Sequence, residues 1–186
     1  MEILEKKVVP KLRFKDKNGN DYEDWNKSVL GEIYSFISTN SLSRDKLNLT
    51  NGNVQNIHYG DIHTKFKTLL DVGEEKIPYI NSDVNLSKIK SSQYCRNGDI
   101  VMVDAAEDYK GTGKMVEVKE ISNHKILAGL HTIHMRPNLD FIRIGFGSYL
   151  LQNKNFRLQI KIIAQGTKVL SISSKRLTKL YFNLPS

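Results

Sequence analysis

The arrangement of apolar residues predicts strands in the middle of the chain. Residues 100–103 read Ile-Val-Met-Val, an uninterrupted apolar run of strand length. Such a run is typical of a strand that is buried on both faces, so we expect it at the centre of a sheet. Residues 115–118 predict a second strand and residues 126–135 a third, which ends before Pro137.

Helical spacing begins after these strands. Apolar residues recur at i, i+4, i+7 and i+8 from Ile142, and at i, i+4 and i+7 from Phe156, which is the spacing of a buried helix face. We expect two short helices or one kinked helix there, followed by a small polar loop at residues 165–168. Strands in the middle and helices later predict an α+β fold, with a central mixed or antiparallel β-sheet and helices concentrated toward the C-terminal end.

The first third of the chain has fewer apolar positions. Residues 1–18 are mostly charged and predict an extended lead-in, and residues 19–21, Gly-Asn-Asp, predict a turn. Trp25 precedes a short apolar patch, and we expect it to anchor the start of the core. Residues 38–56 are rich in Asn, Ser and Thr, which predicts a loop with up to one turn of helix at residues 44–49.

Composition is that of a soluble globular protein, with 39% hydrophobic and 26% charged residues. A length of 186 residues predicts one domain with a sizeable core. No apolar run approaches 18 residues and no charged-then-apolar leader follows Met1, so we expect no membrane association and a cytoplasmic location. The only cysteine, Cys95, excludes an internal disulfide and a cysteine zinc site.

Charge is distributed very unevenly along the chain. Residues 141–186 hold eight of the 28 Lys and Arg residues and none of the 20 Asp and Glu residues, so they account for the whole net charge of +8. Folding and solubility do not require this asymmetry, which indicates a polyanionic partner. Lys154, Arg157 and Lys161 recur at i, i+3 and i+7 and would form one stripe of the second helix. A solvated helix face is the alternative interpretation of that stripe.

Two further pairs of lysines are candidates for contact with nucleic acid. Lys65 and Lys67 flank Phe66, a pattern that suits backbone contact with base stacking, although a surface strand edge has the same pattern. Lys110 and Lys114 enclose Gly-Thr-Gly in a glycine-rich loop. This loop is too short and wrongly spaced for a Walker A phosphate site, so it does not predict ATP binding.

An enzymatic alternative uses Asp104, Glu117 and Lys119. An Asp at the end of one strand and Glu-x-Lys on the next is the arrangement in which PD-(D/E)xK nucleases hold a divalent metal and activate water. The alternation of side chains along a strand would place Glu117 and Lys119 on one face. The pattern is nevertheless loose, and lysine-rich chains contain it by chance.

The string from His58 through Asp61 to His63 also has the residue types of a metal site. Without further His or Cys residues, such a string is more often a turn with structural hydrogen bonds. We therefore expect no bound metal and no cofactor.

Several segments, in order along the chain, resemble the specificity subunit of type I restriction–modification systems. The opening of such a subunit resembles Pro10-Lys-Leu-Arg-Phe14, Asp24-Trp25 and Leu30-Gly-Glu-Ile33. Its interior motifs resemble Ile57-His-Tyr-Gly-Asp-Ile-His63, Ile77-Pro-Tyr-Ile80, Gly98-Asp-Ile-Val101 and Gly129-Leu-His-Thr132. The close of one target recognition domain resembles Gln165-Gly-Thr-Lys168, Ile172-Ser173 and Leu184-Pro185. The order and spacing of these motifs together carry the resemblance, which spans nearly the whole chain.

The resemblance implies a DNA reader that is not itself an enzyme. In that family, two target recognition domains separated by long helices each read one half of a split DNA sequence, and the modification (methyltransferase) and restriction subunits supply the chemistry. Residues 1–186 would then be a single recognition domain without the family's spacer helix. Its partners would be double-stranded DNA and those subunits. An RNA-binding or general interaction module is the third function class that the sequence leaves open.

The family does not fix the base-contacting residues by motif, so the candidates come from side-chain chemistry. Lysine and arginine suit phosphate contacts, and a glutamine in a polar loop can form a bidentate pair with adenine. The candidate DNA-binding residues are Lys65, Lys67, Lys110, Lys114, Lys154, Arg157, Lys161, Gln165 and Lys168.

Overall fold

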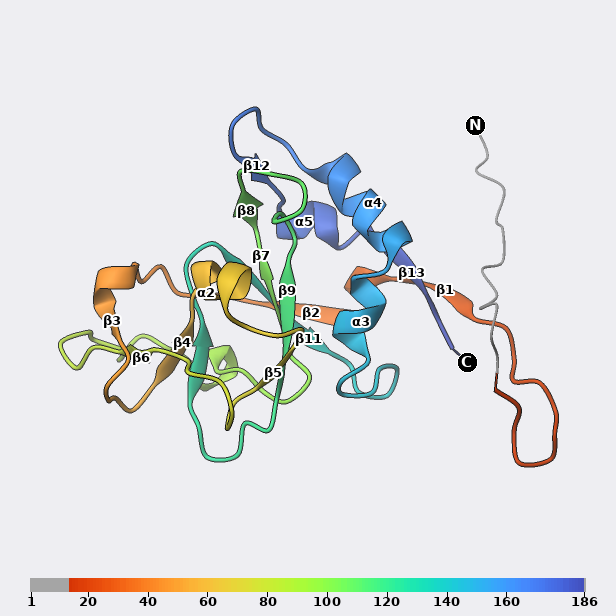
Figure 1. Ribbon diagram of the computed structural model, residues 1–186, viewed down its shortest axis with the longest axis horizontal. Helices are drawn as coiled ribbons and strands as arrows, with labels where there is room; N and C mark the ends of the chain where they lie inside the picture. Colours follow the sequence, from red (N-terminus) through yellow and green to blue (C-terminus); the bar gives the residue numbers. More distant parts are fainter. Residues whose placement is uncertain (1–13, 186) are drawn as a thin grey trace.

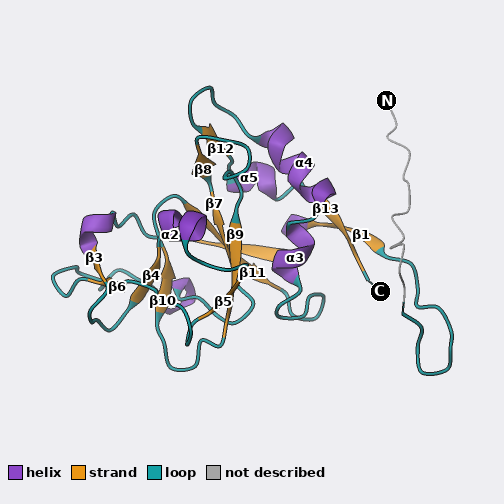
Figure 2. Cartoon of the chain, viewed as in Figure 1, coloured by secondary structure: helices purple, strands orange, loops and turns teal. Residues whose placement is uncertain are grey.

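A five-stranded mixed sheet forms the centre of the fold (Figures 1 and 2). The computed structural model describes residues 14–185, so most of the lead-in expected at residues 1–18, the start of the Pro10 motif and residue 186 lie outside the described residues. The strand order is β2 (Tyr34–Ile37), β11 (Thr132–Pro137), β7 (Ile100–Val103), β9 (Met115–Lys119) and β5 (Leu69–Asp71). Neighbours are antiparallel except β9 and β5, which are parallel. Strand β7 is the middle strand and all its residues are buried, which confirms the prediction from its apolar run.

A four-stranded sheet lies beside the central one. Its order is β10 (Ile126–Ala128), β4 (Gln55–Ile57), β6 (Tyr79–Ile80) and β3 (Leu47–Asn48). The prediction of one strand over residues 126–135 is wrong, because β10 and β11 belong to different sheets. His131 takes a left-handed backbone with φ of 54°, and a Cβ on Gly129 would lie 2.5 Å from the Asn56 side-chain nitrogen. Only glycine, which has no side chain, fits this close approach, so the chain turns between the two sheets at Gly129.

Two short antiparallel pairs complete the strands. One joins β1 (Asn26–Val29) to β13 (Tyr181–Leu184), and the other joins β8 (Ala105–Ala106) to β12 (Leu170–Ser171). The turn predicted near residue 19 is confirmed: the Gly19 amide donates to the Asp16 carbonyl at 3.0 Å, with a Gly19 φ of 84°.

The helices are short and gather toward the C-terminal end, as predicted. They are α3 (Gly147–Leu151), α4 (Lys154–Ile163) and α5 (Ser174–Leu177), with α1 (Leu30–Ile33) and α2 (Tyr59–Thr64) earlier in the chain. Two 3₁₀ turns, η1 (Arg44–Lys46) and η2 (Ser91–Gln93), lie in the polar loops, and η1 confirms the helical turn expected at residues 44–49. Within residues 14–185, no helix has both the length and the apolar character that crossing a membrane requires.

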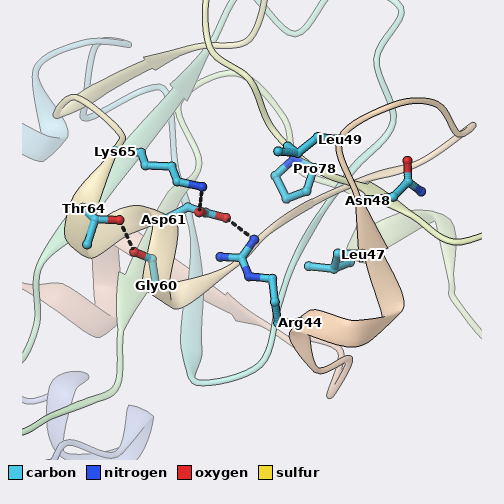
Figure 3. A pocket seen from close by; sticks show the side chains of 9 residues that line it. All are labelled: Arg44, Leu47, Asn48, Leu49, Gly60, Asp61, Thr64, Lys65 and Pro78. Atoms are coloured by element: carbon cyan, nitrogen blue, oxygen red, sulfur yellow. Dashed lines mark hydrogen bonds and ion pairs between the residues drawn. The ribbon is translucent and has the colours of Figure 1, made fainter.

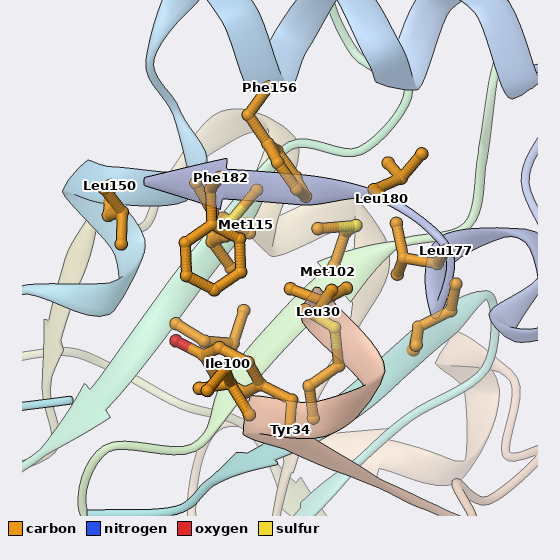
Figure 4. Close-up of a cluster of buried hydrophobic side chains, with 14 of the residues drawn as sticks. Leu30, Tyr34, Ile100, Met102, Met115, Leu150, Phe156, Leu177, Leu180 and Phe182 are labelled. Atoms are coloured by element: carbon orange, nitrogen blue, oxygen red, sulfur yellow. The ribbon is translucent and has the colours of Figure 1, made fainter. Parts of the chain in front are cut away.

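The central sheet is covered on both faces by apolar clusters. Ile100 and Met102 of β7 point to the cluster that contains Phe156 of α4 and Phe182 of β13 (Figure 4). Their neighbours Val101 and Val103 point to the other cluster, under α2. This alternation is the period of two that a strand imposes. Burial on both faces also accounts for the absence of polar residues from this strand.

The first cluster extends to Trp25, near the start of the described residues. Trp25 packs against it and meets the ring of Phe146 edge-on, with ring centroids 6.4 Å apart. The expectation that Trp25 anchors the start of the core is confirmed. The second cluster buries Ile62 of α2 completely, which fixes that helix on the face of the sheet opposite α3 and α4.

Candidate nucleic-acid interface

Helix α2 lies between two hollows on the surface. The first, here named the Asp61 hollow, has a volume of about 500 Å³, and α2 and the η1 region line it (Figure 3). The second, here named the Arg157 hollow, has a volume of about 660 Å³, and α2, residues 105–114 and α4 line it. His58 caps α2, since its Nδ1 accepts a hydrogen bond from the Gly60 amide at 3.1 Å. One short helix thus forms a wall of both hollows.

A buried carboxylate organises the Asp61 hollow. Asp61 is only 1% exposed, and its two oxygens pair with Arg44 Nη1 and Lys65 Nζ, each at 2.8 Å. Burial alone would raise the pKa of Asp61, but the hydrogen bonds from Arg44 and Lys65 outweigh it and hold the pKa below its usual value. The two cations remain 47% and 54% exposed. Asp61 therefore holds two positive charges at the surface in fixed positions.

The Arg157 hollow has a second set of fixed cations. Arg157 Nη2 donates to the carbonyls of Tyr109 and Lys110, at 3.0 and 3.1 Å, and Lys114 Nζ donates to the His63 carbonyl at 2.6 Å. The loop itself is shaped by Asp108, whose carboxylate accepts from the Gly111 amide at 2.6 Å. Burial lowers the pKa of Arg157 from its ordinary value, although an arginine stays charged at neutral pH.

Direct contacts join these cations into one path across the surface, which we name the basic path. It runs from α4 to the 107–114 loop through Arg157, from the loop to α2 through Lys114, and from α2 to η1 through Asp61. The members of the basic path are Arg44, Lys65, Lys110, Lys114 and Arg157. Four of them were predicted from the sequence.

The remaining predicted residues lie outside this path. Lys154 and Lys161 are exposed on α4, which begins at the Asn153 cap and buries Phe156 and Ile160 on its inner face. The helical stripe is therefore divided, because Arg157 turns into the loop while its two neighbours face solvent. The others are exposed on loops: Lys67 after α2, and Gln165 and Lys168 before β12. The Gln165 backbone bridges to Ser171, which leaves its side chain free.

The structure does not bring the three residues of the nuclease hypothesis together. Glu117 is 1% exposed under α3, where its carboxylate accepts from the Gly145 and Ser148 amides at 2.5 and 2.9 Å. The strand register pairs Glu117 with Ile100, so Asp104, just after the end of β7, lies roughly 13 Å from that pair at the usual rise per residue. Lys119 pairs with Asp71 at 3.3 Å. The three side chains do not share a metal site.

One buried group within residues 14–185 has metal-type side chains, namely Cys95, Asp99 and His134. The Asp99 carboxylate is already occupied: it contacts His134 Nε2 at 2.7 Å, Arg136 Nη2 at 2.8 Å and the Arg96 amide at 2.9 Å. Arg136 also donates to the carbonyl of Tyr94. This network links Asp99, just before β7, to His134 and Arg136 of β11, so we interpret the group as structural hydrogen bonding and not as a metal site.

Sequence reasoning missed Arg44. The one-turn helix predicted around it gave its local structure, but nothing in the pattern indicated that Asp61, 17 positions later, would hold it. Its partner Asp61 was expected to make structural hydrogen bonds in a turn, with metal ligation as the alternative, and the structure places it in a helix where it pairs with Arg44 and Lys65. A cation within a polar loop is only a weak indication of a nucleic-acid contact until the fold shows which carboxylate holds it.

Comparisons with known proteins show what the fold resembles. No protein-family model and no curated protein sequence matches the chain. Solved structures do match. The S subunit of a type I restriction–modification system from M. genitalium is 12% identical, with a TM-score of 0.56 over 96% of this chain and 37% of that one. The HsdS subunit from Thermoanaerobacter tengcongensis is 17% identical, with a TM-score of 0.52 over 87% of this chain and 33% of that one.

A third match comes from a structural study of the assembly and conformational transition of the type I restriction–modification system. It is 15% identical, with a TM-score of 0.56 over 92% of this chain and 37% of that one. The chain thus spans about a third of the length of each of these proteins. The likeness agrees with the motifs that run through the sequence in order. This chain has the fold of one third of a type I restriction–modification S subunit.

Proposed function

We propose that the chain is a non-catalytic, sequence-specific DNA-recognition module that reads one half of a bipartite target for a type I restriction–modification complex. The observation that carries this proposal is the basic path, which lines two adjacent hollows with cations, four of which are held in place by a buried carboxylate or by backbone carbonyls. The fold shared with S subunits supports it.

The basic path is suited to duplex DNA because four of its five cations are fixed before binding. A cation that is already oriented loses less side-chain freedom when it meets a phosphate. Lys65 and Lys110 are exposed enough to reach a phosphate oxygen, whereas Arg157 and Lys114 also shape the surface. Lys67, Lys154, Lys161 and Lys168 extend the positive field beyond the path, and Gln165 can contact adenine.

The chemistry of modification and restriction would come from partner subunits, so we expect the chain to act with them on cytoplasmic DNA. We propose residues 1–186 as a single recognition domain. One such domain reads a short half-site, since each correctly read base pair contributes about 1 to 3 kcal/mol of specificity. A second recognition domain would supply the other half.

The test is a titration of the chain against duplex DNA at several salt concentrations. Replacing Lys65 and Lys110 with Gln should flatten the log–log salt slope by about 1.8, since each phosphate contact contributes about 0.9. The matched control replaces Lys15 and Lys17, which lie in the hairpin at the right of Figure 1, away from α2, and should leave the slope unchanged. Equal slopes for both double variants would refute the proposed interface, and equal affinity for RNA would favour a general nucleic-acid binder.

A further inference from the structure

Arg44 is held from two sides at the edge of the Asp61 hollow. Its Nη1 pairs with Asp61 Oδ2 at 2.8 Å, and its Nη2 contacts His58 Nδ1 at 3.2 Å. Figure 3 shows the guanidinium beside the Asp61 carboxylate, with Lys65 on the other side of that carboxylate. Two contacts at different nitrogens fix the plane of the guanidinium as well as its position.

His58 is a firm support because its ring is itself fixed. Two donors share the lone pair of this Nδ1, the Gly60 amide at 3.1 Å and Arg44 Nη2 at 3.2 Å, and the backbone donor fixes the orientation of the ring. Burial and the neighbouring Arg44 lower the pKa of His58, which keeps the ring neutral and able to accept. Asp61 is buried and shared with Lys65, so it too has one orientation. Two residues therefore support one arginine: His58 at the cap of α2 and Asp61 within α2.

The guanidinium keeps donors for a ligand. Each terminal nitrogen of an arginine carries two hydrogens, and the two supports use one from each. The remaining hydrogens belong to a side chain that is 47% exposed at a hollow of about 500 Å³. Two parallel donors in one plane match the O6 and N7 acceptors of guanine in the major groove.

We propose that Arg44 reads a guanine, with Asp61 and His58 as its positioning residues, while Lys65 holds a nearby backbone phosphate. This proposal rests on the proposed function and names one of its specificity-determining residues. A guanine explains the arrangement better than a second phosphate does. A phosphate needs only a single positive charge, which the Lys65 ammonium supplies, whereas a base edge requires a planar fork held in one plane, which the two supports of Arg44 create.

The experiment is selection of bound sequences from a library of randomised duplexes, using residues 1–186. Wild-type protein should enrich a guanine at one position. Arg44→Lys keeps the charge but loses the fork, so that preference should fall by about 5- to 150-fold while the salt slope stays the same. Arg44→Gln should also lose the preference, and it should change the salt slope by less than the 0.9 that loss of a phosphate contact gives. The control Lys46→Gln removes a charge from the same turn, outside the hollow, and should keep the preference.

Asp61→Asn tests the positioning role. It frees Arg44 and adds one net positive charge, so binding to random duplexes should strengthen while the guanine preference falls. A merely structural residue would weaken both together. Thermal melting identifies any unfolded variant. If Asp61→Asn does not fold, Arg44→Lys, a change at a half-exposed surface site, still tests whether Arg44 reads a guanine.

The outcomes distinguish guanine reading by Arg44 from the proposed function, DNA recognition by the chain. An unchanged base preference in Arg44→Lys overturns the role of Arg44 and leaves DNA recognition standing. A loss of affinity in Arg44→Lys that is equal for all sequences also overturns the role of Arg44, because it would make Arg44 a phosphate contact. Absence of binding to any duplex at low salt refutes the proposed function itself.

Discussion

Replacing Glu117 with alanine should lower the free energy of unfolding by about 3 kcal/mol. The buried carboxylate accepts two backbone hydrogen bonds, from Gly145 and Ser148, at the start of α3. Hydrogen bonds to a charged acceptor contribute about 1.5 to 3 kcal/mol each, and relief of the desolvated charge offsets part of the sum. For a chain of this size, 1 kcal/mol corresponds to about 2 to 4 °C, so the melting temperature should fall by about 6 to 12 °C.

Thermal and urea unfolding measure this effect, and Glu117→Gln provides the matched control. Its side-chain oxygen can still accept one of the two amides, but its amide group cannot accept the other, so its loss should be smaller. Binding to duplex DNA should persist in both variants below their melting temperatures. The reasoning is refuted if Glu117→Ala melts like wild type, and above all if it removes a magnesium-dependent cleavage of DNA.

Three further predictions concern charged residues, and a fourth concerns half-site reading. Arg157→Gln should lower stability by about 1 to 2 kcal/mol in urea unfolding, because its contacts with the 107–114 loop are lost. Lys154→Gln with Lys161→Gln should leave stability unchanged and flatten the salt slope by about 1.8 if both meet phosphates; an unchanged slope would make them solvated surface. The pKa of Asp61 is lowered on folding, so its contribution is full above the ordinary value of about 3.9 and is lost as pH falls through the folded pKa. Wild type should therefore lose more stability than Asp61→Asn between about pH 5 and pH 2, measured by melting. Joining the chain to a second recognition domain through a rigid spacer should raise affinity for a two-part site by about 10² to 10⁴, and equal affinity for one-part and two-part forms would contradict half-site reading.

Local patterns predicted the parts of the fold that depend on neighbours in sequence. The apolar run at residues 100–103 predicted the central strand, and the spacing from Phe156 predicted α4. In both elements, the burial of a face determines the period of the apolar residues. The same reasoning failed at residues 126–135. An apolar run looks continuous whether or not the chain changes sheets within it, and only the close approach of Gly129 to Asn56 marks the break.

The candidate site was harder to predict because its contacts join distant segments. Arg157 was assigned to a cationic helix stripe that contacts DNA, but its Nη2 donates to carbonyls almost 50 positions earlier. Glu117 was considered as a metal ligand because it stands in a Glu-x-Lys pattern, whereas its actual partners, two backbone amides, carry no residue-type signal. Periodicity shows which residues are buried, whereas the acceptor that a cation meets depends on how separate elements pack.

The shared wall between the two hollows has a consequence for how this surface can change. A substitution that shifts α2 moves Asp61 on one side and the His63 carbonyl on the other, so it alters both sets of cations together. Substitutions in the two hollows should therefore be epistatic rather than additive, with interaction energies of about 0.5 to 3 kcal/mol. A new sequence preference would then arise through paired changes on both sides of this six-residue helix, and single changes would mostly cost binding without redirecting it.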